Sequence, residues 1–279
     1  MGTVQYLAYR EHQRQRVQTN DTMMGLLAGS KLASQTLMLT EGSKLLMSEI
    51  FPGVEHIRRF NLTTEKAREV LGDAEELLGV LAVPQVMALQ EHLLVGMLEI
   101  LQENVPGVGN LVSGAKAANV HEKFESATGS NFTPETLSLF HLIRTARNTH
   151  IHSGGKANKA LVDAASMAGP PTRQVWTLVT NTGFPTYGLG DKVALNLPEL
   201  IGILAITKRL AEEANSILQQ TLPRSTWADI AVADWLETRR PGNKDQQNKQ
   251  LYGQTRMYYG LLKLTVQDLE AAKARAGIP

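Results

Sequence analysis

The residues best suited to chemistry lie between Arg147 and Gly155. This segment reads Arg-Asn-Thr-His-Ile-His-Ser-Gly-Gly, so a guanidinium, a carboxamide and two imidazoles precede a pair of glycines. Arginine keeps its positive charge at every physiological pH, whereas histidine exchanges a proton near neutrality. A fixed cation beside a proton-exchanging ring suits the cleavage of a phosphodiester. We therefore take this segment as the candidate catalytic site.

Arg147, Asn148 and His152 are the candidate catalytic residues. We expect them on the last turns of a helix that begins near Thr133 and ends at Gly154. Exposed carbonyls at the C-terminal end of a helix favour a protonated imidazole by about 0.3–1 kcal/mol, which suits His152 to act as a general acid or base. Asn148 can donate a hydrogen bond to a phosphoryl oxygen or fix the tautomer of His152.

The spacing of Arg147 and His152 imposes a condition on the site. Side chains five residues apart point about 140° apart around an ideal helix. Both reach one phosphate only if the helix unwinds near Thr149, or if two chains contribute to a shared site. Because a symmetric dimer aligns two copies of one segment, we expect a homodimer with a shared site.

The arginines of this helix also raise a question of burial. Five side chains fall near one line along the helix: Leu137, Phe140, Arg144, Arg147 and Ile151. If this row faces the core, Arg144 and Arg147 each need an anionic partner, because an unpaired buried charge is costly. Glu122 or Glu125 of a neighbouring helix, or a phosphate of the substrate, would serve.

Helical periodicity dominates the rest of the chain. The pattern predicts helices over residues 4–18, about 22–49 (capped by Asp21 or Thr22), 64–83, 84–101, 115–127, 156–167, 198–220, 225–239, 244–264 and 265–276. Two segments alternate as strands do, Gln174–Thr180 and Lys192–Leu197, and predict one small β-hairpin. We expect a predominantly all-α antiparallel helical bundle in residues 1–222. Pro223 then begins a helical C-terminal extension or small appended domain, residues 223–279.

The composition is that of a globular protein. Hydrophobic residues make up 43% of the 279 residues, and 28 Lys and Arg balance 27 Asp and Glu, which argues against nonspecific adhesion to nucleic acid. The chain has no cysteine, which excludes thiol nucleophiles and disulfide scaffolds. Neither a secretory signal nor a membrane span is evident, so we expect a cytoplasmic protein.

The spacing Arg147-Asn148-x3-His152, on a helix of an all-α chain, resembles the HEPN superfamily. That family is marked by an arginine, commonly followed by a polar residue, and a histidine four to six residues further on. The likeness extends as a pattern of elements from about Asp21 to Gln220. It implies a metal-independent endoribonuclease without a cofactor, often a toxin or an antiviral effector, with a site shared across a homodimer and sometimes an inhibitory or effector partner.

The resemblance also implies roles for individual residues. His152 would activate the ribose 2′-OH or protonate the leaving oxygen, Arg147 would stabilise the charge of the phosphorane, and Asn148 would orient the phosphate. The products would be a 2′,3′-cyclic phosphate and a 5′-hydroxyl. Arg144 with His150 fits the same spacing, so these two residues are possible supporting members of the site.

Two alternatives remain open at this point. Many members of the superfamily are noncatalytic binding or dimerisation modules, and here Arg147 and His152 would instead hold an interface together. The chain could also be a regulator that binds nucleic acid through its C-terminal helices. A basic and aromatic set of residues there favours this: Arg239, Arg240, Lys244, Lys249, Tyr252, Tyr258 and Tyr259.

Overall fold

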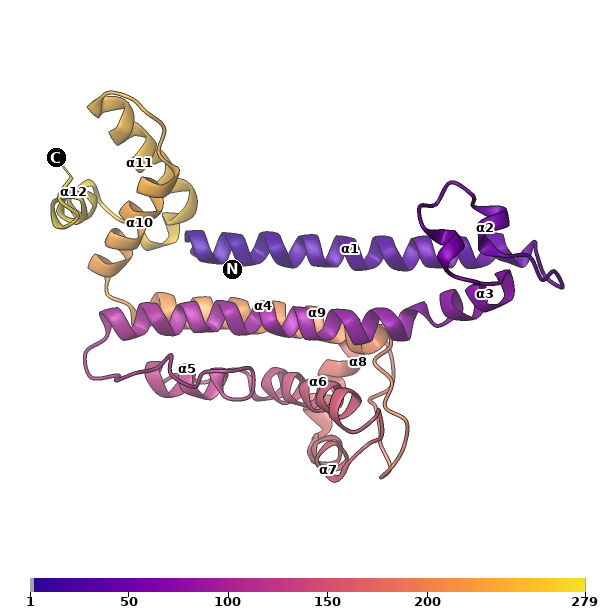
Figure 1. Ribbon diagram of the computed structural model, residues 1–279. Coiled ribbons are helices and arrows are strands. Elements are labelled where there is room, and N and C mark those ends of the chain that lie inside the picture. The colour runs from indigo at the N-terminus through magenta and orange to yellow at the C-terminus, as the bar shows by residue number, and fades with distance from the viewer. Residues whose placement is uncertain (1–2, 279) are drawn as a thin grey trace. The chain divides into compact units, whose positions relative to one another are not determined.

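The computed structural model describes residues 3–278, which form twelve α-helices and two short 3-10 helices and contain no strand. The all-α prediction is therefore confirmed (Figure 1). The helices are α1 (Leu7–Met38), α2 (Met47–Ile50), α3 (Thr64–Gly72), α4 (Ala74–Asn104), α5 (Val120–Thr128), α6 (Pro134–His152), α7 (Lys159–Met167), α8 (Pro170–Thr180), α9 (Leu197–Thr221), α10 (Arg224–Thr238), α11 (Lys244–Tyr258) and α12 (Val266–Arg275), with 3-10 turns at Ile57–Arg59 and Gly260–Leu262.

The chain divides into two compact units. The first unit comprises residues 1–16, 87–137 and 206–279, and the second comprises residues 17–86 and 138–205. Each unit is therefore built from separated stretches of sequence. The C-terminal helices α10 to α12 belong to the first unit, whereas the candidate catalytic segment of α6 belongs to the second.

α1 is one unbroken helix of 32 residues, so the predicted break at Asp21 or Thr22 is wrong. The hydroxyl of Thr22 donates to the carbonyl of Gln18, 2.8 Å away, and so bonds within the helix instead of capping a new one. The predicted start of a helix at residue 64 is confirmed, and the side chain of Thr63 caps α3 by accepting from the backbone amide of Lys66 at 3.2 Å.

α4 continues through Pro84, whereas the sequence pattern predicts that one helix ends at residue 83 and another begins at residue 84. Proline removes one backbone donor from a helix interior, but the apolar face continues on both sides, and Val83 and Met87 are both buried. By length and composition alone α4 is apolar enough to cross a membrane, a test that the core helix of a soluble protein also passes. Of the apolar stretch that passes this test, 44% is buried inside the protein, with Leu94 and Leu98 fully buried.

The predicted hairpin is wrong in both its strands and its pairing. Residues 174–180 lie in α8, whose buried face is Thr172, Trp176 and Thr180, one turn apart, while Leu178 is 74% exposed. The β-branched residues of this segment favour a strand, but burial of Trp176 at helical spacing outweighs that preference. Residues around Lys192 are extended, and their one bridge joins Lys192 to Lys156.

A hydrophobic core in the second unit supports the end of α6. Its fully or nearly buried members are Leu142, Ala146, Ala157, Leu161, Ala165, Val193 and Leu195. Leu195 lies so close to α4 that a Cβ on Gly79 would fall 1.6 Å from its carbonyl oxygen, so only glycine fits at residue 79. This contact holds the extended segment around Val193 against the helices.

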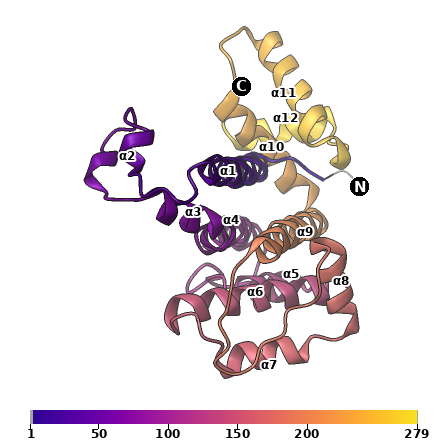
Figure 2. The same ribbon diagram turned by 90° about the vertical axis from the view of Figure 1, so that its right-hand side faces the viewer.

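In the first unit, the N-terminal residues pack on the C-terminal helices. The rings of Tyr6 and Trp227 lie 5.8 Å apart, and Arg10 binds Asp234 with two hydrogen bonds of 2.8 Å. The three predicted C-terminal helices are present within one or two residues at their starts, and the second is shorter, ending at Tyr258 (Figure 2). A boundary at residue 223 stays a prediction.

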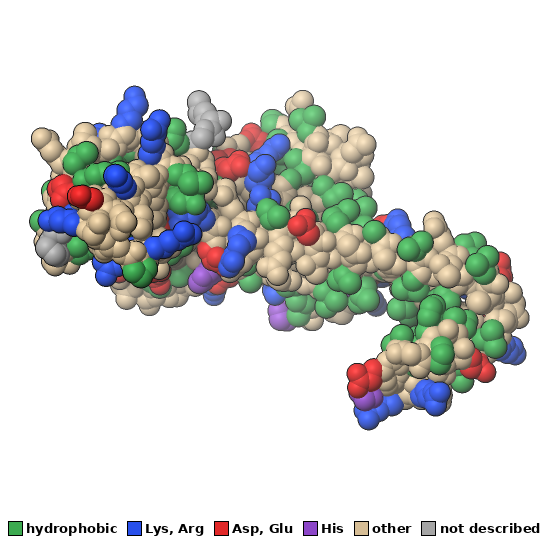
Figure 3. All heavy atoms as spheres, turned by 90° about the horizontal axis from the view of Figure 1, so that it is seen from above, with side chains coloured by type: hydrophobic (Ala, Val, Ile, Leu, Met, Phe, Trp, Pro, Cys, Tyr) green, Lys and Arg blue, Asp and Glu red, His purple; other side chains and the backbone are tan. Residues whose placement is uncertain are grey.

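Hydrophobic side chains reach the surface over the segment from the end of α1 to α3 (Figure 3). Leu39 is 88% exposed and Phe60 67% exposed. This surface belongs to the second unit.

Candidate functional site

The candidate site lies at the C-terminal end of α6, as the sequence predicts. Acidic Glu135 stands in the first turn of this helix, and His150 and His152 stand in the last, which complements the helix dipole. Gly154 and Gly155 follow with φ values of +59° and +72°. This left-handed backbone favours glycine and ends the helix at the predicted place.

The face of α6 that meets the core is only partly the predicted one. On the predicted row Phe140 is fully buried, whereas Arg144 and Arg147 are half-buried and Ile151 is 48% exposed. The other buried residues of the helix around it are Leu139, Leu142, Ile143, Ala146 and Thr149. The centre of the buried face therefore lies about a third of a turn from the predicted row, and the two arginines stand at its border.

Arg147 and Asn148 are joined directly. Nη1 of Arg147 donates to Oδ1 of Asn148 at 2.9 Å. The Nε atom of Arg147 is buried without a partner, and no carboxylate in the described residues pairs with this guanidinium. A half-buried cation whose one partner is a neutral amide keeps most of its capacity to bind an anion, such as a phosphate.

His150 is held in place by the chain that follows α6. Its Nδ1 lies 3.3 Å from the carbonyl oxygen of Val193. Because a carbonyl only accepts, Nδ1 carries the hydrogen, and in the neutral ring Nε2 has the free lone pair. The ring also lies against Gly155, where a Cβ would sit 3.6 Å from Nδ1. The amide of Val193 in turn donates to the carbonyl of Gly155 at 2.7 Å. The end of α6 and the segment around Val193 are therefore hydrogen-bonded to each other.

His152 is exposed and projects from a different face of α6 than Arg147. The helix does not unwind near Thr149, since the carbonyl of Thr149 accepts from the amide of Ser153 at 2.9 Å. Side chains five residues apart therefore stay about 140° apart. Asn148 lies between them: it bonds Arg147 and precedes His152 by four residues, on the same face. One chain alone does not bring the arginine and this histidine to one point.

The two supporting candidates have different roles in the structure. Nε of Arg144 donates to Nδ1 of His141, at 3.3 Å, so its neighbour along the helix orients it. His150 is three residues from Arg147, about 60° around the helix, and so shares a face with Arg147 more closely than with Arg144. The pairing that the structure favours within one chain is therefore Arg147 with His150.

Further cations surround the end of α6. Lys156 follows the glycine pair, is exposed, and has no carboxylate partner among residues 3–278. Lys192 forms an isolated antiparallel β-bridge with Lys156, and its ammonium group pairs with the carboxylate of Glu76 at 2.9 Å. Lys156 therefore adds a positive charge after the end of α6 that no carboxylate of the described residues pairs.

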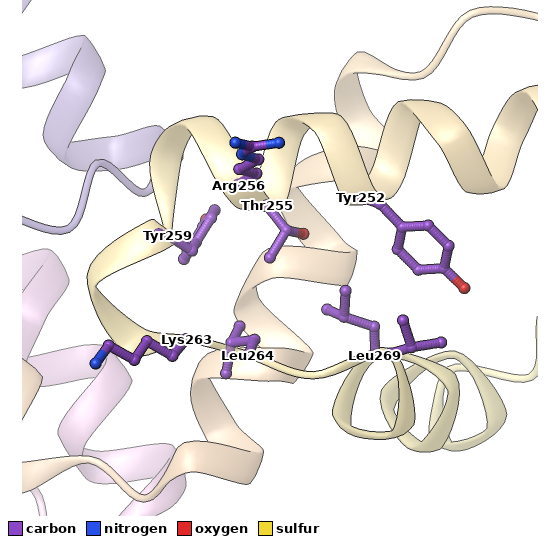
Figure 4. Close-up of a pocket in the computed structure, with 9 residues that line it drawn as sticks. Tyr252, Thr255, Arg256, Tyr259, Lys263, Leu264 and Leu269 are labelled. Carbon is purple, nitrogen blue, oxygen red and sulfur yellow. The ribbon is translucent and has the colours of Figure 1, made fainter.

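The C-terminal tyrosines are engaged in packing. Tyr259 is fully buried and donates to Asp234 at 2.7 Å, Tyr258 lies beneath the guanidinium of Arg10 at 4.0 Å, and Tyr252 donates to Glu270 at 2.8 Å. Two of them border a pocket of about 280 Å³ between α11 and the start of α12 (Figure 4).

These contacts leave little of the aromatic surface that stacking on nucleic acid requires. Binding through the C-terminal helices stays a prediction that rests on their basic residues.

The positioning contact between His150 and Val193 could not be found from the sequence, because the two residues are far apart in the chain and no local signal marks their pairing. No protein-family model, curated protein or solved structure matches this chain.

Proposed function

We propose that the protein is a metal-independent endoribonuclease of the HEPN type that acts as a homodimer on RNA. The observation that carries the proposal is the state of Arg147, a half-buried guanidinium bound to Asn148 and to no carboxylate. It stands near the end of α6, three residues before His150 and about 60° from it around the helix, whereas His152 projects from a different face. A guanidinium without a carboxylate partner suits the binding of an anion such as a phosphodiester.

In the proposed reaction the ribose 2′-oxygen attacks the adjacent phosphorus and the bond to the 5′-oxygen breaks. A base takes the proton of the 2′-hydroxyl, and an acid gives one to the leaving oxygen. His152 performs one of these transfers, Arg147 neutralises the added charge of the phosphorane, and Asn148 holds the phosphate. The products are a 2′,3′-cyclic phosphate and a 5′-hydroxyl.

The dimer is part of this proposal because α6 stays helical. With Arg147 and His152 about 140° apart on one helix, the arginine of one protomer has to meet the histidine of its partner. Ile151, between the two histidines, is 48% exposed and offers apolar surface for such a contact. We include in the proposal an antiparallel arrangement of the helices, a cytoplasmic location and a role as a toxin or antiviral effector under an inhibitory or effector partner.

The test is cleavage of RNA by the purified protein in the presence of EDTA. Arg147→Ala and His152→Ala should each reduce cleavage about a hundredfold or more and leave the melting temperature unchanged. Arg58→Ala, which removes an exposed guanidinium in the same unit, is the matched control and should cleave normally. Cleavage that survives both site substitutions would refute the assignment.

A second candidate, a noncatalytic binding module, is favoured by one observation: a single chain does not bring Arg147 and His152 together. In that case the motif holds an interface. His152→Ala would then lower the melting temperature or dissociate the dimer, and RNA would stay intact at high protein concentration.

A further inference from the structure

The outer face of α1 carries almost no charge in the second unit. Between Val17 and Leu39, which both belong to that unit, only Asp21 and Lys31 are charged. The ammonium group of Lys31 pairs with the carboxylate of Glu75 at 2.6 Å, so it is engaged within the unit. The solvent face of a surface helix normally carries charged and polar side chains. An exposed face with apolar residues in their place marks a surface that another protein covers.

The exposed residues of this stretch include one straight stripe along the helix. Each member of the stripe lies within about 40° of Ala28 around the helix axis. The buried Thr19 and Leu37 lie on the opposite side. The stripe consists of Val17, Asp21, Met24, Ala28, Leu32, Gln35 and, directly after the last residue of α1, Leu39, all of them exposed.

The apolar members of the stripe are arranged symmetrically about Ala28. Met24 and Leu32 stand four residues to either side of it. Val17 and Leu39 stand eleven residues to either side. Their exposed fractions range from 48% to 88%. A two-fold axis beside Ala28 that reverses the helix direction sets each of them against an apolar residue of a second copy. Because a symmetric pair needs a self-complementary surface, this arrangement favours a second copy of the chain over an unrelated partner.

The polar members of the stripe follow the same symmetry. Asp21 and Gln35 stand seven residues to either side of Ala28, and both are exposed. In the antiparallel pair, the carboxylate of Asp21 lies opposite the carboxamide of the partner's Gln35, which can donate a hydrogen bond to it. The stripe is therefore complementary to itself in its polar groups as well as in its apolar ones.

The centre of the stripe allows two helices to approach closely. Ala28 has the smallest side chain of the stripe, and Gly25 and Gly29 stand beside it. A Cβ on either glycine would meet no atom within 4 Å, so the space next to them is open. Helices that pack through small side chains approach to an axis separation of about 8 Å. From Val17 to Leu39 the stripe is about 33 Å long, which gives an interface near the lower end of the size range of specific complexes.

We propose that α1 pairs with α1 of a second copy of this chain, antiparallel and centred on Ala28. The pairing removes the apolar members of the stripe from water and gives Asp21 a hydrogen-bond donor. It goes beyond the proposed function, because it concerns α1 and not α6. Its tests measure association and not the cleavage of RNA, so the failure of one proposal leaves the other standing.

The first experiment uses the absence of cysteine from the chain, since every disulfide must then form at an introduced residue. Ala28→Cys in the full-length protein should cross-link with itself under mild oxidation, because the two copies of residue 28 meet beside the axis. Leu26→Cys is the control, since Leu26 is 57% exposed but lies about 160° further around the helix. It should cross-link at least about tenfold more slowly, because it meets its counterpart only by collision. Equal rates would overturn the proposal.

Two further variants determine the direction of the paired helices. Met24→Cys and Leu32→Cys should each cross-link slowly alone and rapidly when the two proteins are mixed. The reason is that residues on opposite sides of the axis face each other only in an antiparallel pair. Rapid cross-linking of each variant with itself would show a parallel pair, and would contradict the proposed symmetry.

The last experiment measures association without cross-links, by sedimentation of the full-length protein. Leu32→Glu places a carboxylate in the contact and should weaken association about a hundredfold or more, which lowers the average mass. Leu26→Glu adds the same charge to the same helix outside the stripe and should associate as the unaltered protein does. If the two variants lower the mass equally, or if neither does, α1 is not the interface.

Discussion

Two arginines, Arg10 and Arg147, show how differently this chain uses the same side chain. The guanidinium of Arg10 binds both oxygens of Asp234 at 2.8 Å and lies over the ring of Tyr258. Asp234 raises the pKa of Arg10 further, first through these hydrogen bonds. Arg147, also partly buried, has one bond to a neutral amide. The guanidinium of Arg10 is therefore bonded by groups of the protein itself. The guanidinium of Arg147 keeps donors for another acceptor.

The difference extends to the groups around each arginine. Asp234 is 4% exposed and also accepts from Tyr259 and Gln254, so every member of this cluster has its partners inside the protein. Around Arg147, by contrast, His152 is exposed and Lys156 has no carboxylate partner in the described residues. The first cluster stabilises the unit that it joins. Under the proposed function, an external anion completes the bonding of the second.

The largest effect is expected from breaking the saturated cluster. Asp234→Ala leaves the partly buried guanidinium of Arg10 without its counter-charge and removes the acceptor of Tyr259, which should cost about 3–5 kcal/mol of unfolding free energy. Chemical denaturation measures this cost. Asp229→Ala is the matched control, because Asp229 stands on the same helix in an exposed pair with Arg275, and it should cost less than about 1 kcal/mol. Equal losses would show that Asp234 is no more important than a surface residue.

The next effect tests whether two chains share the site of Arg147. Arg147→Ala and His152→Ala are each expected to be inactive alone. If the arginine of one protomer works with the histidine of its partner, a mixed dimer of the two variants keeps one intact site. Equal mixing after subunit exchange should then restore about a quarter of the unaltered activity, since about half of the dimers are mixed and each has one site of two. No recovery after demonstrated exchange would place both residues of a working site in one chain.

The sequence predicts much of what is local in this structure. A helix begins at residue 64 as expected, with Thr63 as its cap, and Gly154 and Gly155 end α6 just after the histidines. These features depend on a few neighbouring residues, whose side chains bond the backbone within the same turn. The placement of the candidate residues at a helix end therefore follows from the sequence alone.

The remaining features depend on contacts between distant parts of the chain. α8 is helical because Trp176 is buried at helical spacing, although its β-branched neighbours favour a strand. The buried face of α6 is set by the core around Leu142 and Ala146, not by the arginines. Asp234 meets Arg10 across 224 positions of sequence. No periodicity within one segment contains this information, so neither the saturated cluster nor the contact of His150 with Val193 could be predicted.

The smallest effect is expected from giving Arg147 a carboxylate partner like the one that Arg10 has. Asn148→Asp replaces the amide oxygen that Arg147 contacts at 2.9 Å with a carboxylate of nearly the same shape. In this half-buried position the new ion pair should add about 0.2–1 kcal/mol of unfolding free energy. The carboxylate also competes with the phosphate for the guanidinium, so cleavage of RNA should fall about tenfold. Asn148→Ala, which removes the amide without adding charge, should reduce cleavage less and give no gain in stability. If Asn148→Asp cleaves RNA as well as the unaltered protein, the capacity of Arg147 for an anion is not what the site uses, and the contrast with Arg10 has no functional meaning.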